Sequence, residues 1–181
     1  MPEFKVFTKI NVPYSKVWEK VSTVGEIEKW SPVKFTSVAE DVSIQNGLRL
    51  KQKTKQLGVF GVNDMEVIDA FTNSKVRRQY SFADVLDKNR FNRITYMFDD
   101  NSITTMMDLC EDQETKEILE EKAKTEPAFQ VDVMAHVYYT YGSTFWRSIA
   151  EVVFIKPFFT MIFRPRVTKS LAKLKAICEQ D

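Results

Sequence analysis

The sequence predicts an α+β domain in which a curved antiparallel sheet of about seven strands wraps around a long C-terminal helix. Three observations support this prediction. Strand-like alternation of apolar and polar residues recurs from the N-terminus to residue 141, and one short helical stretch interrupts it early. A helical pattern long enough to cross a small domain follows at 144–178. Strands first and one long helix last are typical of an α+β domain.

Length and composition limit the classes of protein to consider. The 181 residues fit one domain, 1–181, and the 13% aromatic content with 14 Phe exceeds what closing a core requires. The formal net charge of +1 creates no field that recruits nucleic acid, so we expect no nucleic-acid partner. The two cysteines, Cys110 and Cys178, lack metal or disulfide spacing. With no signal-peptide pattern at the N-terminus, we expect a reducing, cytoplasmic location.

The N-terminal segments are expected to form a strand followed by two short helices. Period-two alternation over 4–10 predicts the strand. Pro13 ends the ladder, and Ser15 is the expected N-cap of the first helix. A second helical turn, 26–30, ends because Pro32 pushes the preceding residue out of the helical region.

A meander of strands is predicted from residue 33 onward, with turns such as Asn46-Gly47 between them. The predicted strands are 34–39, 48–55, 62–71, 75–83, 90–98, 103–110 and, last, 131–141. One face of 48–55 carries a row of four cations, which we expect to face water rather than an anionic surface: Arg49, Lys51, Lys53 and Lys55. The Glu- and Lys-rich segment 111–128 is an excursion, readable either as an exposed helix or as a polar strand pair.

The C-terminal helix is expected to be bent or divided at Pro157 and Pro165. Its second half is amphipathic, because Leu171, Leu174 and Ile177 recur every three residues, so one face should pack on the sheet. The most apolar run, 146–163, contains three charged residues and a proline, which excludes a membrane span. Burial against the sheet is the preferred interpretation of this run, and transient membrane contact is the alternative.

A sheet that wraps a helix diverges from it near one end, and the gap is a common ligand site. Each candidate lining residue taken alone fits ordinary core packing, so only the set predicts a pocket. The candidate ligand-binding residues are Trp30, Phe35, Met65, Arg78, Tyr80, Phe82, Tyr96, Phe98, Met107, Trp146, Phe154 and Phe158.

Arg78 shares its strand parity with Tyr80 and Phe82, which places it on the inner face of the sheet. An unpaired guanidinium is costly there, so Arg78 needs an anionic partner. A structural pair with Asp69 or Glu66 is the preferred interpretation, and a ligand carboxylate is the alternative. A bulge near Arg78 would reverse the parity and place it in solvent.

His136 is the only histidine and therefore the only side chain suited by its ordinary pKa to proton transfer near neutrality. The apolar residues of its strand occupy the opposite face, so we expect His136 to point outward. The sequence contains no hydrolase, nucleotide-binding or zinc-protease motif. Catalytic residues therefore stay unknown, and we predict neither a metal nor a cofactor.

Several short segments resemble one known superfamily. They are Ile10-Asn11-Val12-Pro13 leading into Ser15-Lys16-Val17-Trp18, then Lys29-Trp30-Ser31-Pro32, Asn46-Gly47 and Leu171-x-x-Leu174-Lys175. In this order the chain resembles the START-like superfamily, often labelled SRPBCC, which includes birch pollen allergens and polyketide cyclase/dehydrase-like proteins. The resemblance implies a helix-grip fold whose sheet and helix enclose lipids, sterols, polyketides or other apolar ligands.

Three functions are compatible with these observations. Binding or transport of an apolar small molecule requires only a dry pocket, a polar anchor such as Arg78 and a movable lid. A cyclase- or dehydratase-type enzyme would need an acid or base in the same cavity, with Tyr80, Tyr96, Asp69 or His136 as candidates. A scaffold with a filled gap and a protein partner is the third. We prefer binding, because the sequence offers no acid/base pair at convincing spacing.

Overall fold

The computed structural model describes residues 3–31, 34–36, 40–56, 59–73, 76–85, 92–139 and 156–180. Side chains are described at these positions except 34, 53–56, 59–63, 69, 71–73 and 156–159. In the described chain, seven antiparallel strands form one sheet in the order β1-β7-β6-β5-β4-β3-β2. The strands are β1 (Glu3–Ile10), β2 (Lys34–Phe35), β3 (Arg49–Gln56), β4 (Val59–Asn73), β5 (Arg77–Asp84), β6 (Arg93–Asp100) and β7 (Val131–Tyr138).

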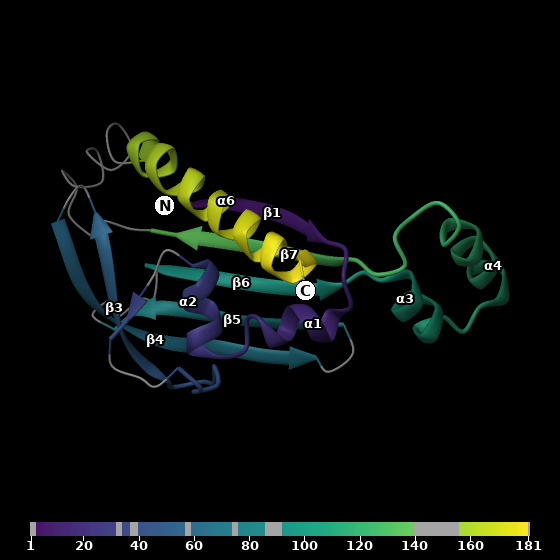
Figure 1. Cartoon of the computed structure of the whole chain (residues 1–181), viewed down its shortest axis with the longest axis horizontal. Helices are drawn as coiled ribbons and strands as arrows, with labels where there is room; N and C mark the ends of the chain where they lie inside the picture. Colours follow the sequence, from purple (N-terminus) through teal and green to yellow (C-terminus); the bar gives the residue numbers. More distant parts are fainter. Residues whose placement is uncertain are drawn as a thin grey trace.

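Helices α1, α2 and α6 gather on one face of this sheet, which we call the inner face. Helix α6 (Lys156–Gln180) runs along β1 and β7, while α1 (Tyr14–Glu19) and α2 (Val24–Trp30) lie over β5 and β6 (Figure 1). Leu171 and Leu174 of α6 are fully buried against this face. The predicted α+β helix-grip architecture is therefore confirmed.

Strand register determines which side chains reach the inner face. Tyr80 of β5 pairs with Tyr96 of β6, and Tyr96 pairs with Ala135 of β7. Because side chains alternate across a strand, residues at even steps from Tyr80 share its face, including Phe82 and Arg78. The parity predicted for Arg78 is confirmed.

A bulge in β4 contributes to the curvature of the sheet. The register between β4 and β5 shifts between Ile68 and Phe71, which frees the backbone of Ala70 from the regular ladder. The Asn46 side chain provides hydrogen-bond partners for this backbone: Asn46 Oδ1 accepts from Ala70 N at 2.6 Å and Nδ2 donates to Ala70 O at 3.4 Å. The following Gly47 has a φ of 81°, a conformation that favours glycine at this turn.

The two short helices follow the predicted order with one correction. Pro13, rather than Ser15, is the N-cap residue of α1, and it provides no side-chain cap. Pro fits the start of a helix because it lacks the N–H that would need a partner. In α2, Thr23 accepts a hydrogen bond from Glu26 N at 3.4 Å, and the helix ends at Trp30 because Ser31 is extended before Pro32.

Helix α6 is continuous through Pro165, so of the two predicted effects, a bend or a division, the division is wrong and the bend stays a prediction. Pro157 is the second residue of α6, where a proline leaves no intrahelical hydrogen bond unmade. Of the predicted helix 144–178, residues 144–155 lie outside the described chain. Arg49 and Lys51 of β3 are exposed, as expected of the basic row.

The predicted strand 103–110 is wrong, because these residues form helix α3 (Ile103–Leu109). The Asp100 carboxylate accepts hydrogen bonds from Ser102 N at 3.1 Å, Ser102 Oγ at 2.5 Å and Thr105 Oγ1 at 2.7 Å. These local bonds favour a helix start over a hairpin turn. The buried Asp100 is thus the last residue of β6, and its carboxylate also holds the first turn of α3.

The excursion that the sequence left open is helical. Helix α4 (Gln113–Lys122) begins where Asp112 Oδ2 accepts from Thr115 N at 2.9 Å, a side-chain N-cap. Together α3 and α4 form a lobe, residues 101–130, that projects beyond the end of the sheet (Figure 1). Gln130 N donates to Ser102 Oγ at 3.1 Å, which joins the two ends of the lobe at its base.

Candidate functional site

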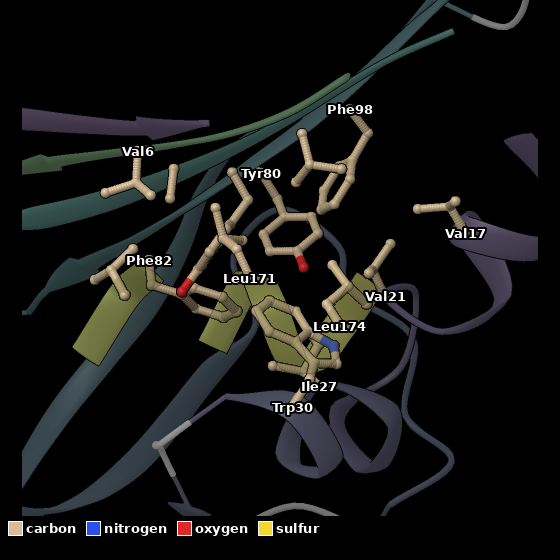
Figure 2. Packing of buried hydrophobic residues seen from close by; sticks show 14 of the residues in the cluster. Val6, Val17, Val21, Ile27, Trp30, Tyr80, Phe82, Phe98, Leu171 and Leu174 are labelled. Atoms are coloured by element: carbon tan, nitrogen blue, oxygen red, sulfur yellow. The ribbon is translucent and has the colours of Figure 1, made fainter. Parts of the chain in front are cut away.

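Aromatic rings from three elements, β5, β6 and α2, meet between the inner face of the sheet and α6. Tyr80 has ring centroids at 5.4 Å from Phe82, 5.7 Å from Tyr96 and 5.6 Å from Phe98. Trp30 of α2 packs edge-on against Tyr96 at 5.3 Å. Offset and edge-to-face rings at such distances attract one another beyond their burial. Figure 2 shows this cluster with Leu171 and Leu174 of α6 closing it from the helix side.

The position of Trp30 is set by a hydrogen bond as well as by packing. Trp30 Nε1 donates to Lys20 O at 3.0 Å, which ties α2 to the end of α1. Only 2% of Trp30 is exposed. Phe35 of β2 extends the cluster, with its ring 5.8 Å from that of Phe82. The rings therefore form a continuous apolar surface from α2 to the far strands of the sheet.

Two buried hydrogen-bonding groups on β5 have no hydrogen-bond partner within the described chain. They are Tyr80 Oη and Arg78 Nε, which lie two residues apart on the inner face. The Tyr80 hydroxyl points away from the sheet among the apolar side chains of Trp30 and Leu174 (Figure 2). Leaving such a group unpaired costs about 1–3 kcal/mol, so native proteins rarely do so without a reason.

Among the described side chains, the Arg78 guanidinium contacts aromatic rings and forms no ion pair with an acid. Its Cζ lies 4.5 Å from the Trp18 ring centroid and 5.5 Å from that of Tyr14, both on α1. Ring faces attract a cation but leave the N–H groups of a guanidinium free to donate in the plane of the guanidinium. The register places Glu66 opposite Ala83, far along β5 from Arg78, and the Asp69 side chain is outside the described set. The preferred pair with Glu66 is therefore wrong.

Burial keeps the tyrosines at the site protonated. It raises the pKa of Tyr80 well above the ordinary 10.0, with a smaller contribution from Tyr96, and it also raises the pKa of Tyr96. Burial also raises the pKa of Tyr14, against an opposing effect of Arg78. Tyr14 Oη donates to Phe98 O at 3.2 Å. All three phenols are thus neutral hydrogen-bond donors at physiological pH.

The structure brings together most, but not all, of the predicted lining residues. Trp30, Phe35, Met65, Arg78, Tyr80, Phe82, Tyr96 and Phe98 lie on the inner face or pack against it. Met107 lies on α3 in the lobe and does not belong to this cluster. Trp146 and Phe154 fall outside the described residues, as does the side chain of Phe158, so their part in the site stays a prediction.

Tyr14 and Trp18 are the site residues that sequence reasoning missed. The apolar spacing of Val17, Trp18 and Val21 indicates only that one face of α1 is buried. It carries no information about which strand that face meets. The ring-to-guanidinium contacts with Arg78 depend on the packing of α1 across the end of β5.

His136 lies on the outer face of the sheet, as expected, but it is buried rather than exposed. It pairs with Lys5 of β1 and Thr95 of β6, and its ring lies 3.8 Å from that of Tyr138. Its Nε2 is 3.2 Å from Glu3 Oε2. The sheet separates His136 from the aromatic cluster, so it cannot exchange a proton with a group held there.

Stability should fall as His136 takes up a proton. Burial lowers its pKa below 6.5, with the Glu3 hydrogen bond opposing this effect and Lys5 adding to it. The unfolded chain therefore binds the proton first, so stability is full above about pH 6.5 and declines as pH drops through that value. Each unit of pKa difference contributes about 1.4 kcal/mol.

Urea unfolding at about pH 7.5 and about pH 5.5 should show a larger loss for the wild type than for His136→Gln. The variant also acts as the control for carboxylates that titrate in both proteins. Equal losses in the two proteins would contradict the lowered pKa of His136.

The described residues lack both a metal-binding cluster and a membrane-spanning helix. They hold no group of three or more His, Cys, Asp or Glu side chains arranged to bind a metal ion. None of the described helices is long and apolar enough to cross a membrane. The predicted membrane contact through 146–163 falls mostly outside the described residues and stays a prediction.

Comparisons with known proteins agree with this architecture. The sequence matches no family model and no curated protein. Among solved structures, the protein TTHA0849 from Thermus thermophilus aligns with a TM-score of 0.56 and 11% identity, over 99% of this chain and 98% of that one. A START superfamily protein from Mycobacterium smegmatis aligns with a TM-score of 0.53 and 12% identity, over 98% and 97%. Such low identities show the fold alone, and that fold is the START-like, or SRPBCC-like, helix grip.

Proposed function

We propose that the protein binds an apolar small molecule between the inner face of the sheet and α6. The polar end of the ligand accepts hydrogen bonds from Tyr80 Oη and from the Arg78 guanidinium. The observation that carries this proposal is the pair of buried donors without a partner in the described chain, two residues apart on one strand face. A ligand acceptor would relieve the cost of both groups at once.

The surroundings of these donors define the chemical class of the ligand. The buried rings of Trp30, Phe82 and Phe98 surround the two donors with apolar groups, which favours a ligand with a hydrophobic or flat body. A cationic and a neutral donor side by side favour a carboxylate or a polarised carbonyl at its end. Lipids, sterols and polyketide-like molecules with such an oxygen fit both requirements. The proposal is binding or transport, with the ligand unchanged.

Proton-transfer catalysis has less support from the described residues. A cyclase or dehydratase needs a group that accepts a proton near neutrality. The raised pKa values of Tyr80 and Tyr96 make both phenols donors rather than bases. His136 lies on the opposite face of the sheet. No observation favours the enzyme over the binding protein.

Tyr80→Phe should have opposite effects on binding and on stability. Removing the hydroxyl deletes one ligand hydrogen bond, which should weaken binding of an acceptor-bearing ligand by about tenfold. The same change removes a buried group without a described partner, so the ligand-free protein should be no less stable and gain up to about 1–3 kcal/mol. Titration with fatty acids, sterols and aromatic polyketides measures the first effect, and urea unfolding measures the second.

Tyr14→Phe is the matched control for stability. Its hydroxyl has a partner, Phe98 O, so this variant should lose about 0.5–1.5 kcal/mol. If Tyr80→Phe binds the tightest ligand of the panel as well as the wild type does, the hydroxyl is not a ligand anchor and the proposal fails in this form.

A further inference from the structure

Exposed apolar side chains concentrate on the lobe, residues 101–130. Six large hydrophobic residues are exposed in the described chain, and four of them are on the lobe: Met106, Leu109, Ile118 and Phe129. Two short helices cannot bury these side chains between them, and the lobe projects away from the sheet (Figure 1). Exposed apolar side chains that gather on a projecting segment can form part of an interaction surface.

The lobe also carries a charge opposite to that of the rest of the chain. It holds eight carboxylates and three lysines, a formal charge of −5, whereas the whole chain is +1 and the remainder is therefore +6. All eight carboxylates are exposed, and none forms an ion pair with a described residue: Asp108, Glu111, Asp112, Glu114, Glu117, Glu120, Glu121 and Glu126. A basic surface would complement the lobe.

The outward face of α4 carries an exposed apolar side chain and carboxylates next to one another. Ile118 is 53% exposed. Glu114 and Glu121 lie one turn before it and one turn after it on the same face, and Glu117 lies beside it. An exposed apolar side chain is thus surrounded by three carboxylates.

The outer face of β1 has the complementary pattern. Phe7 is 68% exposed, the largest value among the exposed hydrophobic residues of the described chain. Lys5 and Lys9 flank it on the same face, and both are exposed without an ion-pair partner in the described chain. Because β1 is an edge strand of the described sheet, no other described strand lies beyond this stripe. An exposed apolar side chain is thus flanked by two cations.

We propose that two copies of the chain form a two-fold symmetric dimer in which the lobe of each copy docks on the outer face of β1 of the other. Ile118 would pack against Phe7, with the glutamates of α4 facing Lys5 and Lys9. The spacings agree: Lys5 and Lys9 are about 13 Å apart along a strand. Glu114 and Glu121 are about 10 Å apart along a helix, a difference that long side chains bridge.

Two-fold symmetry makes both contacts form together. In such a dimer the contact between the lobe of the first copy and β1 of the second is repeated between the lobe of the second copy and β1 of the first. Each lobe is therefore bound and the outer face of each β1 is covered. The exchange brings each lobe, of net charge −5, against a partner whose remaining residues carry +6 in total, and the dimer as a whole carries +2. At the base of the lobe, the Asp100 and Ser102 hydrogen bonds hold α3 in place as a preformed arm.

Charge reversal with mixing tests this proposal. One variant carries Lys5→Glu and Lys9→Glu, and a second carries Glu114→Lys, Glu117→Lys and Glu121→Lys. Each variant alone places like charges at both contacts, so its dimer dissociation constant should rise at least tenfold. Sedimentation equilibrium measures this constant. In an equimolar mixture the reversed lobe meets the reversed β1, and the wild-type pair forms on the other side. The mixture should therefore form a heterodimer close to wild-type affinity.

The matched control is Lys169→Glu with Lys173→Glu, the same change of charge on exposed residues of α6, which should leave the dimer intact. The wild-type dimer should also weaken between about 0.05 M and about 0.5 M NaCl, because salt screens exposed charges. A wild type that is monomeric at about 0.2 mM in low salt would overturn the proposal. So would variants that dimerise like the wild type, or a mixture that fails to recover. Circular dichroism confirms that each variant is folded.

Discussion

Arg78→Met should weaken binding of a carboxylate-bearing ligand by roughly 10- to 100-fold, because a charge-assisted hydrogen bond contributes about 1.5–3 kcal/mol. The guanidinium is the one cation on the inner face of β5, and its Nε has no hydrogen-bond partner in the described chain. The Met side chain keeps an apolar stem against Trp18, so the protein itself should lose little stability. Calorimetric titration and urea unfolding separate the two quantities.

Arg78→Lys is the informative companion variant. Lysine keeps the charge but lacks the planar guanidinium. In Arg78 this group lies over the rings of Trp18 and Tyr14 and still has N–H groups at its edge that can donate hydrogen bonds. We expect an affinity between those of the wild type and Arg78→Met. Unchanged affinity in both variants would remove Arg78 from the site, and a loss of stability as large as the loss of affinity would make its role structural.

Phe98→Ala should lower the free energy of unfolding by about 3–5 kcal/mol. Phe98 is fully buried, and its ring lies 5.6 Å from Tyr80 and 6.2 Å from Trp18. Truncation removes the ring that connects the sheet to α1 and leaves a cavity that the surrounding strands cannot close. The midpoint of urea unfolding measures this loss at constant slope.

Met161→Ala provides the control for Phe98→Ala. Met161 is 64% exposed on α6, so its truncation should change stability by no more than about 0.5 kcal/mol. A loss near 1 kcal/mol for Phe98→Ala would indicate a loosely packed inner face, in conflict with the ring contacts described for it.

Alternation in the sequence was sufficient to assign the inner face. In β5 the period of two places Tyr80 and Phe82 on one face, and in β6 it does the same for Tyr96 and Phe98, without any knowledge of the neighbouring strands. It also placed Arg78 on that face, which a propensity argument alone would not do. The long C-terminal helix was equally accessible, because Leu171 and Leu174 recur at helical spacing.

Helix α3 shows where local patterns fail. The β-branched Ile103, Thr104 and Thr105 favour a strand, and the preceding Asp-rich segment is typical of a hairpin turn. The outcome depends on Asp100, whose carboxylate accepts from Ser102 and Thr105 and so begins a helix. Side-chain hydrogen bonds decide between the hairpin and the helix here, and a pattern of residue types does not show which of these bonds form.

Contacts between elements that lie far apart along the chain also could not be predicted from the sequence. Arg78 was expected to pair with an acid, because a charge on an apolar face needs compensation. In the described part of the chain, two rings of α1 contact Arg78, and this arrangement depends on how α1 crosses the sheet. The same holds for His136, whose burial on the outer face comes from Tyr138 and from its neighbours on the adjoining strands.

The central claim is that the inner face holds an apolar molecule with a hydrogen-bond acceptor. Native mass spectrometry of protein purified from its own source, followed by organic extraction, tests it most directly. We predict a stoichiometric apolar molecule bearing a carboxylate or carbonyl oxygen, and its loss during purification of Arg78→Met. A clean apoprotein that also takes up no fatty acid, sterol or aromatic polyketide would contradict the claim and indicate a filled core.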